Sequence, residues 1–372
     1  MKKVKRKGKV NNMEKLKVGI IGATGFVGQR FVTLLEDHPW FEVTTLAASS
    51  RSAGKTYEET MNGRWKIAEP MPKALKDIVV KNAADIDDVA SNIDFCFCAV
   101  DMNKDDIKTL EETYAKREIP VVSNNSAHRW TPDVPVIVPE LNPMHSDIIS
   151  TQRKRLGTNV GFVTAKPNCS IQSYVPAIHP LMDFEPLKLM VSTYQAISGS
   201  GKVFADWPEI MDNVIPYIGG EEEKSEQEPL RIWGSIEGEE IVKAHYPMIS
   251  AHCYRVPVSD GHMASVSVTF KDKPEIAEIL SRWENFKGLP QELELPSAPK
   301  QFLRYIDEQD RPQSKLDRDY EKGMGVTIGR LREGNLFQYK FACLSHNTIR
   351  GAAGGAILTA ELLKAQGYIV KK

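Results

Sequence analysis

The sequence predicts an α/β protein whose N-terminal part is a doubly wound parallel sheet, followed by a second domain. The prediction rests on alternation. Apolar runs at 17–21, 41–47, 94–100 and 120–123 alternate with helical stretches such as 29–36 and 104–117, which is the order of elements that builds parallel sheets. The first run leads directly into a glycine-rich turn, Gly22-Ala23-Thr24-Gly25-Phe26-Val27-Gly28. With 372 residues, the chain is long enough for two domains with separate cores.

The glycine-rich turn is typical of a dinucleotide site in a Rossmann-type domain. Glycines at 22, 25 and 28 permit a tight turn, a close approach of the backbone to a pyrophosphate, and close packing of helix on strand. The phosphates would lie at the N-terminus of the helix that follows. The strand before the turn and the helix after it make the motif specific. The expected cofactor contacts are Gly22, Thr24, Gly25, Phe26, Val27 and Gly28.

The second apolar run, 41–47, should end near the adenosine ribose of this cofactor. An NAD site usually carries an Asp or Glu there for the 2′-hydroxyl. This chain has Ser49, Ser50, Arg51 and Ser52 instead, and small hydroxyls beside a cation suit a 2′-phosphate. We therefore predict NADP(H) as the cofactor. The alternative is a surface turn in which Arg51 is only solvated.

Composition and charge give no argument for nucleic acid or a membrane as a partner. The net charge is −1, and no apolar run approaches the length that spans a bilayer. Residues 1–15 form a basic tail that we expect to be disordered. We do not expect it to be a secretory signal, because it lacks the apolar segment of one. Five cysteines without disulfide-framework spacing favour a reducing cytoplasm. Cys96 and Cys98 share one face of a strand, but no second Cys/His pair stands at ligand spacing, so we expect core packing and no metal.

The strongest candidate for chemistry is Cys169, within the stretch Ala165-Lys166-Pro167-Asn168-Cys169-Ser170-Ile171. Pro167 ends the preceding extended segment, so Cys169 should lie at a strand-to-helix turn. The unpaired N–H groups of a following helix, expected at 170–182, would lower the thiol pKa and provide a nucleophile. The alternative is a small buried hydrophobic residue, which is the commoner fate of a lone cysteine.

Candidate binding and acid–base groups surround this cysteine in the sequence. Arg129 follows the strand at 120–123 and could bind a phosphate or carboxylate, or be a surface residue. A strand at 187–194 ends in Gln195 and the small-residue run 198–201, which suits close approach of a ligand or a plain loop.

The acidic stretch 221–223 would ordinarily be a solvated helix face. Arg255 and His262 stand on either side of a predicted hairpin turn, from which a carboxylate clamp and an acid–base group could reach one pocket. Residues 285–320 are expected to be long connections, and 325–331 with 337–343 a hairpin.

Taken in order, these motifs resemble aspartate-β-semialdehyde dehydrogenase, in its archaeal and fungal branch, over nearly the whole chain. The matching segments are 22–28, Pro167-Asn168-Cys169-Ser170, Gln195 with 198–201, Arg255 with His262, and 346–354. The resemblance implies an NADP-binding Rossmann domain of residues 16–165 plus 348–372, and a mixed-sheet catalytic and dimerisation domain of residues 166–347. It also implies a homodimer or homotetramer.

The resemblance implies roles residue by residue. Cys169 would be the nucleophile, His262 the acid/base, and Gln195 an orienting group for the thioester. The implied substrate contacts are Arg255 for the α-carboxylate, Glu221 for the amino group (with Glu222 and Glu223 leaving the register open), and Arg129, Asn168 and Lys224 for phosphate. Ser198, Gly199 and Asn347 would lie at the cofactor.

The implied activity is NADPH-dependent reductive dephosphorylation of L-4-aspartyl phosphate to L-aspartate 4-semialdehyde, in lysine, methionine and threonine biosynthesis. The nearest rival is a malonyl-CoA reductase-like acyl-CoA reductase, against which Asn168 argues because it fits a phosphate-releasing site. A rival from another class is an NADP-binding regulator without catalysis. The set Cys169, Gln195, Arg255 and His262 argues against a regulator.

Overall fold

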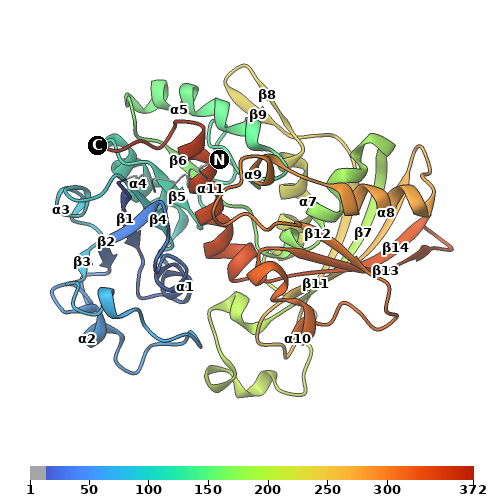
Figure 1. Cartoon of the computed structure of the whole chain (residues 1–372), viewed down its shortest axis with the longest axis horizontal. Coiled ribbons are helices and arrows are strands. Elements are labelled where there is room, and N and C mark those ends of the chain that lie inside the picture. The colour runs from blue at the N-terminus through green and yellow to red at the C-terminus, as the bar shows by residue number, and fades with distance from the viewer. Residues whose placement is uncertain (1–13) are drawn as a thin grey trace, which may run out of the picture.

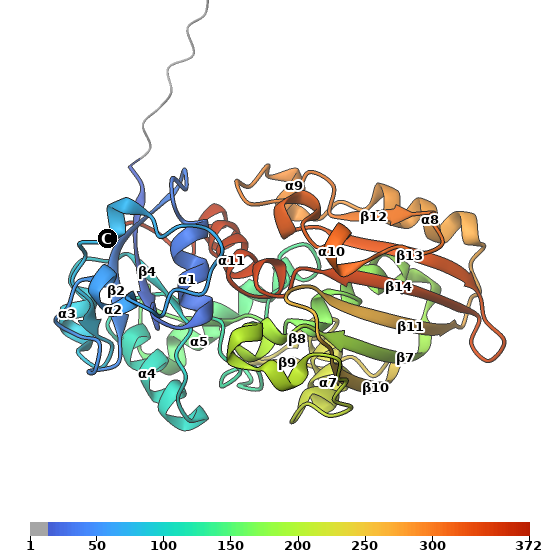
Figure 2. The ribbon, with the colours of Figure 1, turned by 90° about the horizontal axis from the view of Figure 1, so that it is seen from below.

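The computed structural model describes residues 14–372. Two six-stranded sheets lie side by side along the long axis of the molecule (Figure 1). The view from below shows the last helix, α11, between them (Figure 2). The predicted basic tail, residues 1–15, falls almost wholly outside the described residues, and the first strand begins at Leu16. Within residues 14–372 no helix is long and apolar enough to cross a membrane.

The N-terminal sheet is entirely parallel, with strand order β3-β2-β1-β4-β5-β6. After β3 the chain crosses to the other side of β1, which makes the carboxyl ends of β1 and β4 the switch point where ligands of such sheets bind. This sheet confirms the predicted doubly wound fold. Its strands are β1 (Leu16–Ile21), β2 (Phe41–Ala48), β3 (Lys81–Asn82), β4 (Phe95–Cys98), β5 (Val121–Ser123) and β6 (Val163–Ala165).

Helices surround the parallel sheet, and the last one comes from the far end of the sequence. Every residue of α11 from Gly354 to Leu363 is buried, and its apolar side chains share a core with β1, β4 and β5. Such all-round burial fits the mostly apolar sequence of this helix, and its buried Glu361 is hydrogen-bonded to His38 at 2.8 Å. The others here are α1 (Phe26–Leu34), α2 (Tyr57–Met61), α3 (Ile86–Ala90), α4 (Lys104–Lys116) and α5 (Ile149–Leu156), and α11 itself spans Gly354–Ala365.

The second sheet is mixed, with strand order β10-β7-β11-β14-β13-β12. The pairs β10–β7 and β12–β13 are parallel, and the pairs β7–β11, β11–β14 and β13–β14 are antiparallel. The strands are β7 (Pro186–Gln195), β10 (Met248–Arg255), β11 (His262–Phe270), β12 (Leu303–Ile306), β13 (Val326–Glu333) and β14 (Tyr339–Ser345). The remaining elements are a hairpin of β8 (Ser235–Glu237) and β9 (Glu240–Val242), and helices α6 (Val175–Ile178), α7 (Glu221–Ile232), α8 (Ile276–Asn285), α9 (Leu289–Glu292) and α10 (Ser314–Asp317).

Three local predictions differ from the structure. Arg255 and His262 do not flank a hairpin, because β7 lies between β10 and β11 in the sheet. The stretch 285–320 contains the edge strand β12, paired with β13. The helix expected at 170–182 is broken into a 3₁₀ turn at Ser170–Gln172, the four-residue α6, and a second 3₁₀ segment at His179–Phe184. Pro176 and Pro180 cannot donate helical hydrogen bonds, which accounts for the breaks.

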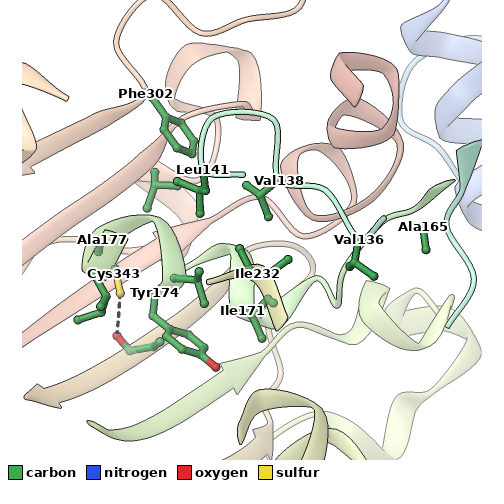
Figure 3. Close-up of a cluster of buried hydrophobic side chains, with 14 of the residues drawn as sticks. Val136, Val138, Leu141, Ala165, Ile171, Tyr174, Ala177, Ile232, Phe302 and Cys343 are labelled. Carbon is green, nitrogen blue, oxygen red and sulfur yellow. Dashed lines mark hydrogen bonds between the residues drawn. The ribbon is translucent and has the colours of Figure 1, made fainter. Parts of the chain in front are cut away.

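The two sheets meet through a buried apolar junction. Residues 133–142 are all buried although they form no strand of the main sheets. Figure 3 shows Val136, Val138 and Leu141 of this connection lying between Ala165 of β6 on one side and Phe302 and Cys343 on the other. One continuous core therefore links the parallel sheet to the mixed sheet, which fixes the loops of both around the space between them.

Candidate active site

The glycine-rich turn lies between β1 and α1, as predicted, and its glycines are sterically required. Gly22 has φ +92°, and a Cβ there would stand 2.3 Å from the carbonyl oxygen of Ala99. A Cβ on Gly28 would stand 2.2 Å from the carbonyl oxygen of Gly22. No side chain caps α1 at Gly25, so its first N–H groups are available to an anion. The turn thus has the geometry of a phosphate cradle.

The loop after β2 carries the groups predicted for the ribose phosphate. Ser49, Ser50 and Arg51 are exposed, and Ser52 is buried. Within residues 14–372 no ion pair or hydrogen bond involves the Arg51 guanidinium. No carboxylate stands between Ala48 and Ser52. These groups fit a 2′-phosphate better than a free 2′-hydroxyl.

Cys169 lies just beyond β6, at the start of the Ser170–Gln172 turn. Its side chain packs against the chain entering α11, since a Cβ on Gly351 would stand 2.8 Å from the Cβ of Cys169. The small-residue segment around Gly351 therefore lies directly against the backbone at Cys169. A three-residue 3₁₀ turn cannot supply the dipole of a regular helix. The charge of a Cys169 thiolate must be balanced in another way.

His262, the first residue of β11, is fully buried beside Cys169. Its Nε2 lies 3.4 Å from Sγ of Cys169, and the backbone N–H of Ala196 donates to its Nδ1 at 3.0 Å. Because Nδ1 accepts this bond, the neutral ring carries its proton on Nε2, which faces the sulfur. Burial, with the nearby Arg255 guanidinium and His346, holds the pKa of His262 well below its usual range. His262 is therefore a neutral donor at physiological pH.

Glu221 is the first residue of α7 and faces the same place. Its exposed fraction is 8%, and its carboxylate accepts hydrogen bonds from Asn168 Nδ2 (2.9 Å), Gln195 Nε2 (3.3 Å) and Lys224 Nζ (2.7 Å). Although burial acts to raise it, the pKa of Glu221 is lowered by the charge and hydrogen bond of Lys224 and by the two amides. Four predicted substrate-site residues thus form one connected cluster.

The other two glutamates of the acidic run lie elsewhere. Glu222 accepts a hydrogen bond from the backbone N–H of Cys253 (3.3 Å), and Glu226 accepts one from Ala251 (3.0 Å). Glu223 is exposed. The acidic face of α7 therefore covers the free edge of β10, which protects unpaired strand donors. Of the three candidates, only Glu221 faces Cys169.

The two predicted arginines have different partners. Arg255 donates from Nη1 to the carbonyl oxygen of Ala196 at 2.7 Å, and within residues 14–372 no carboxylate pairs with it. Gly199 makes room for it, because a Cβ there would stand 2.8 Å from Nη1 of Arg255 and 3.0 Å from Nε2 of His262. Arg129 is buried and pairs with Glu228 at 2.9 Å. Arg255 is consequently free to bind a carboxylate, whereas Arg129 is already neutralised.

A cavity of about 470 Å³ joins these groups to the cofactor side. Asn347 lies on its wall, with Nδ2 donating to Ser198 Oγ (2.9 Å) and Oδ1 accepting from the Gly261 N–H (2.8 Å). Gln195, Arg255 and His262 stand behind this wall and are nearly fully buried. The predicted site residues that line the cavity are Val27, Arg129, Asn168, Cys169, Ser198, Gly199, Glu221, Lys224 and Asn347.

Sequence reasoning missed three buried charged residues around the site. Glu228 on α7 accepts the backbone N–H of Asn168 (2.7 Å) as well as the Arg129 side chain. Glu111 on α4 accepts from Ser123 and Asn125, beneath the loop that leads to Arg129. Lys166 is 3% exposed. Glu228 occurs one helical turn beyond Lys224, a spacing that could have placed it on the cavity side of α7. Nothing local distinguishes Glu111 or Lys166 from surface residues.

Comparison with known proteins identifies the family. A model described as "Semialdehyde dehydrogenase, NAD binding domain" matches residues 17–149, and one described as "Semialdehyde dehydrogenase, dimerisation domain" matches residues 178–350. An aspartate-semialdehyde dehydrogenase from Methanothermobacter thermautotrophicus is 44% identical over 349 residues, covering 93% of this chain and 98% of the relative. This chain belongs to the aspartate-semialdehyde dehydrogenase family.

Other members of the family agree in sequence and in structure. The Aspergillus fumigatus aspartate-semialdehyde dehydrogenase is 42% identical and covers 95% of this chain and 99% of its own. A crystal structure of the Candida albicans aspartate-semialdehyde dehydrogenase with NADP superposes with a TM-score of 0.85 at 38% identity, covering 95% of this chain and all of that one. The archaeal and fungal likeness inferred from the motifs is confirmed.

Proposed function

We propose that this enzyme catalyses the NADPH-dependent reductive dephosphorylation of L-4-aspartyl phosphate to L-aspartate 4-semialdehyde, a step in lysine, methionine and threonine biosynthesis. The observation that carries the proposal is the 3.4 Å approach of Cys169 Sγ to His262 Nε2 beside a polar cavity. The named relatives and the NADP complex of the Candida albicans protein support the same activity. They give no support to a malonyl-CoA reductase.

NADP(H) fits the N-terminal site because of the steric and charge features of its loops. The pyrophosphate would lie against Gly22, Gly25 and the open N-terminus of α1, and the 2′-phosphate against Arg51 and its neighbouring serines. When bound, the cofactor supplies the hydride. The wall formed by Ser198, Gly199 and Asn347 would receive the nicotinamide end.

The chemistry proposed for the chain's own residues begins at Cys169. Its thiolate attacks the acyl carbon of aspartyl phosphate, the carbon–sulfur bond forms, the carbon–oxygen bond to phosphate breaks, and a thioester remains. His262 presents its Nε2 proton to the oxyanion that develops on this carbon after reduction. Collapse of that species breaks the carbon–sulfur bond, releases the aldehyde and regenerates the thiolate. Gln195 would orient the acyl oxygen.

The substrate contacts follow from charge. Arg255, which pairs with no carboxylate among the described residues, would bind the α-carboxylate through its planar fork. Glu221 would receive the amino group, and Lys224, Asn168 and Arg129 would contact the phosphate. Arg129 can do so only alongside Glu228, to which it is already bonded, so we expect it to contribute less than Lys224 to phosphate binding.

The test is phosphate-dependent reduction of NADP by aspartate semialdehyde, with malonate semialdehyde plus CoA and with NAD as controls. We expect activity with the first pair alone. Activity only with the CoA pair would overturn the substrate assignment and leave the nucleophile and cofactor in place. Replacing Cys169 by Ala should abolish turnover while NADP binding survives. Arg255→Lys should mainly raise KM, because one ammonium cannot reproduce the guanidinium fork.

We further infer that the enzyme is a homodimer that assembles through the outward face of β7 and β10. That face exposes Met190, Tyr194 and Met248, and the Tyr194 and Tyr254 rings stack at 5.9 Å. The matching dimerisation model spans these strands. Light scattering should give the mass of two chains, and Met190→Glu should yield monomers. A tetramer that Met190→Glu leaves intact would place the interface elsewhere.

We also propose a cytoplasmic location and a division into 16–165 plus 348–372 and 166–347. The five cysteines are all free in the structure, which suits a reducing compartment. The strands of the two sheets and the return of α11 to the first sheet support the division. Fractionation of the source cells should recover the enzyme in the cytosol.

A further inference from the structure

Lys166 is a buried lysine three residues before the nucleophile. Its exposed fraction is 3%, and its Nζ donates to the carbonyl oxygen of Pro167 at 3.2 Å, which is its one recorded hydrogen bond within residues 14–372. No carboxylate of those residues lies within ion-pair distance of it. Burying a charged group without a counter-ion is costly. Burial lowers the pKa of Lys166 to about 7, so the side chain keeps its charge above that pH only where an anion stabilises it.

Two other buried cations of this region, Arg350 and Arg129, already have carboxylate partners. Arg350 forms a double hydrogen bond with Glu140 (2.7 and 2.5 Å), and both side chains are fully buried. Arg129 pairs with Glu228. These two ion pairs are each neutral as a unit. Among residues 14–372, Lys166 and Arg255 therefore remain as buried cations near Cys169 without a carboxylate, and Arg255 is the group assigned to the substrate α-carboxylate.

The packing brings Lys166 and Cys169 against the same segment of chain. A Cβ on Gly355 would stand 2.9 Å from Cε of Lys166, and a Cβ on Gly351 would stand 2.8 Å from Cβ of Cys169. The two glycines are four residues apart, on either side of the kink at Ala352 (φ −139°, ψ −106°), where the chain passes from Ile349–Ala353 into α11. Because both glycines lack a side chain, the segment 351–355 lies directly against the lysine stem and the cysteine.

A protonated histidine, which often stabilises a catalytic thiolate, is missing here. His262 is kept neutral, because Nδ1 accepts the Ala196 N–H and because burial lowers the pKa of the ring. It offers the sulfur a donor and no positive charge. Burial and the Glu221 carboxylate raise the pKa of the Cys169 thiol, and Lys166 is the foremost of the cations that oppose them, ahead of Arg129 and Arg255.

We propose that Lys166 is the buried counter-cation of the Cys169 thiolate and thereby sets the ionisation of the nucleophile. It acts through Cys169 and does not line the cavity, so it is a positioning residue for the charge of the sulfur. The inference rests on the proposed role of Cys169. When the thiolate is consumed in the thioester, the lysine loses its anion. Burial, with the charges of Arg129 and Arg350, then favours its neutral form, and the Glu228 carboxylate is the remaining group that opposes this.

The decisive measurement is the rate at which iodoacetamide alkylates Cys169 as a function of pH, followed by the mass of its peptide in the full-length enzyme. Lys166→Met and Lys166→Gln should both slow the reaction at least about tenfold at neutral pH and move the midpoint up by about one pH unit, with the rates converging at high pH. Lys104→Met is the matched control, since Lys104 lines the cavity but is exposed, and should leave the midpoint unchanged.

The two variants separate charge from packing. The Gln amide can still donate to the Pro167 carbonyl. If Lys166 had a purely structural role, the midpoint of alkylation would therefore shift in Lys166→Met alone, or the melting temperature would fall while the midpoint stayed the same. His262→Ala should move the midpoint less than Lys166→Gln does. An unchanged midpoint in folded Lys166→Gln, with NADPH still bound, overturns the proposal. Turnover without Cys169 would instead overturn the proposed function.

A second measurement needs no substitution of Lys166. The ionisation of two interacting groups is linked in both directions. Removing the Cys169 thiolate must therefore lower the pKa of Lys166. In enzyme labelled with ¹⁵N-lysine, alkylation of Cys169 should shift the titration of one buried ε-amino group to lower pH. A spectrum in which every lysine titrates as before would contradict the inference even if both lysine variants failed to fold.

Discussion

The two sheets of this enzyme bury their faces differently. In the parallel sheet, β4 and β5 are buried at every position, because helices cover both sides. In the mixed sheet burial alternates along β7, where Leu189, Val191 and Thr193 are buried and Met190 and Tyr194 are exposed. A sheet covered on both faces can offer ligands only its strand ends. A sheet with one open face has a surface left for a second copy.

The catalytic groups reflect the same difference. Cofactor groups of the parallel sheet stand in loops directly after strands, so their place follows from the order of the sequence. Gln195, Arg255 and His262 stand at ends of β7, β10 and β11, and they meet only because β7 pairs with both other strands. Substitutions can test separately the contact between the sheets and the ion pairs, buried carboxylates and glycines of each half.

The largest effect should come from breaking the ion pair between the sheets. Arg350→Met leaves the Glu140 carboxylate buried without a partner and also removes the guanidinium that stacks 4.5 Å above Phe302. We expect a loss of about 3–5 kcal/mol of unfolding free energy, measured by urea denaturation. Arg282→Met, which breaks an exposed pair with Asp183, is the control and should cost less than about 1 kcal/mol. Equal losses would show that the junction is not special.

Next in size is a pH effect confined to the parallel-sheet side. Burial raises the pKa of Glu111 to about 7, against the hydrogen bonds from Ser123 and Asn125, whereas an unfolded glutamate titrates near about 4.3. The folded enzyme binds this proton more tightly, so the contribution is fully present below about pH 4.3 and is lost as the pH rises through about 7.

The expected contribution of Glu111 is at most about 4 kcal/mol. Urea unfolding at several pH values between 5 and 8 should show that the unfolding free energy of the wild type falls as the pH rises. This fall should be smaller in Glu111→Gln. Glu228→Gln is the comparison, because that buried carboxylate already has Arg129 as its partner. If the wild type and Glu111→Gln decline in parallel, the assignment of this titration to Glu111 is wrong.

A pair of glycine substitutions contrasts the two halves of the site. In Gly28→Ala the new Cβ meets backbone atoms of Gly22 and Ala23, which cannot move aside, so we expect a loss of about 1–3 kcal/mol and weaker NADP binding. In Gly199→Ala it meets the ends of the Arg255 and His262 side chains. The melting temperature of Gly199→Ala should change little, while its kcat/KM should fall by about 100-fold. The reverse pattern would mean that the turn is the more adaptable region.

The smallest effect should come from the exposed ion pair that joins the two halves. Lys66, from the cofactor side, lies 2.7 Å from Asp206, which follows the small-residue loop, and both side chains are about one-third exposed. Lys66→Met should change the unfolding free energy by less than about 1 kcal/mol, with a difference that disappears at high salt. A larger, salt-independent loss measured by urea unfolding would give this loop a structural role.

Local patterns predicted the parallel half of the fold and most of the site. The strand, glycine turn and helix around Gly22 need no information beyond their own residues. Cys169 could be placed at a turn because Pro167 constrains the chain before it. The order of a mixed sheet has no such local signature, which is why β7 was not expected between β10 and β11 and why the edge strand β12 was missed.

Buried charges were the other source of error. A lysine such as Lys166 has the same sequence context as a solvated one, and only the glycine at 355 makes room for its stem. The prolines at 176 and 180 break the helix that we expected at 170–182, and the consequence for the thiol depends on the 3₁₀ turn that forms instead. Which carboxylate of the acidic run faces Cys169 depends on where α7 begins, at Glu221.

The return of α11 to the first sheet also bears on how the protein is made. Ile357, Leu358 and Leu362 complete a core that includes Val18, Ile20 and Phe97, so strands translated at the start depend on a helix translated last. Domains generally fold as units during synthesis. Here the cofactor half cannot complete its core during synthesis until the entire catalytic half has been translated, so its apolar surface stays exposed until then. A stop codon that removes only the last twenty residues would therefore destabilise the N-terminal half of the chain.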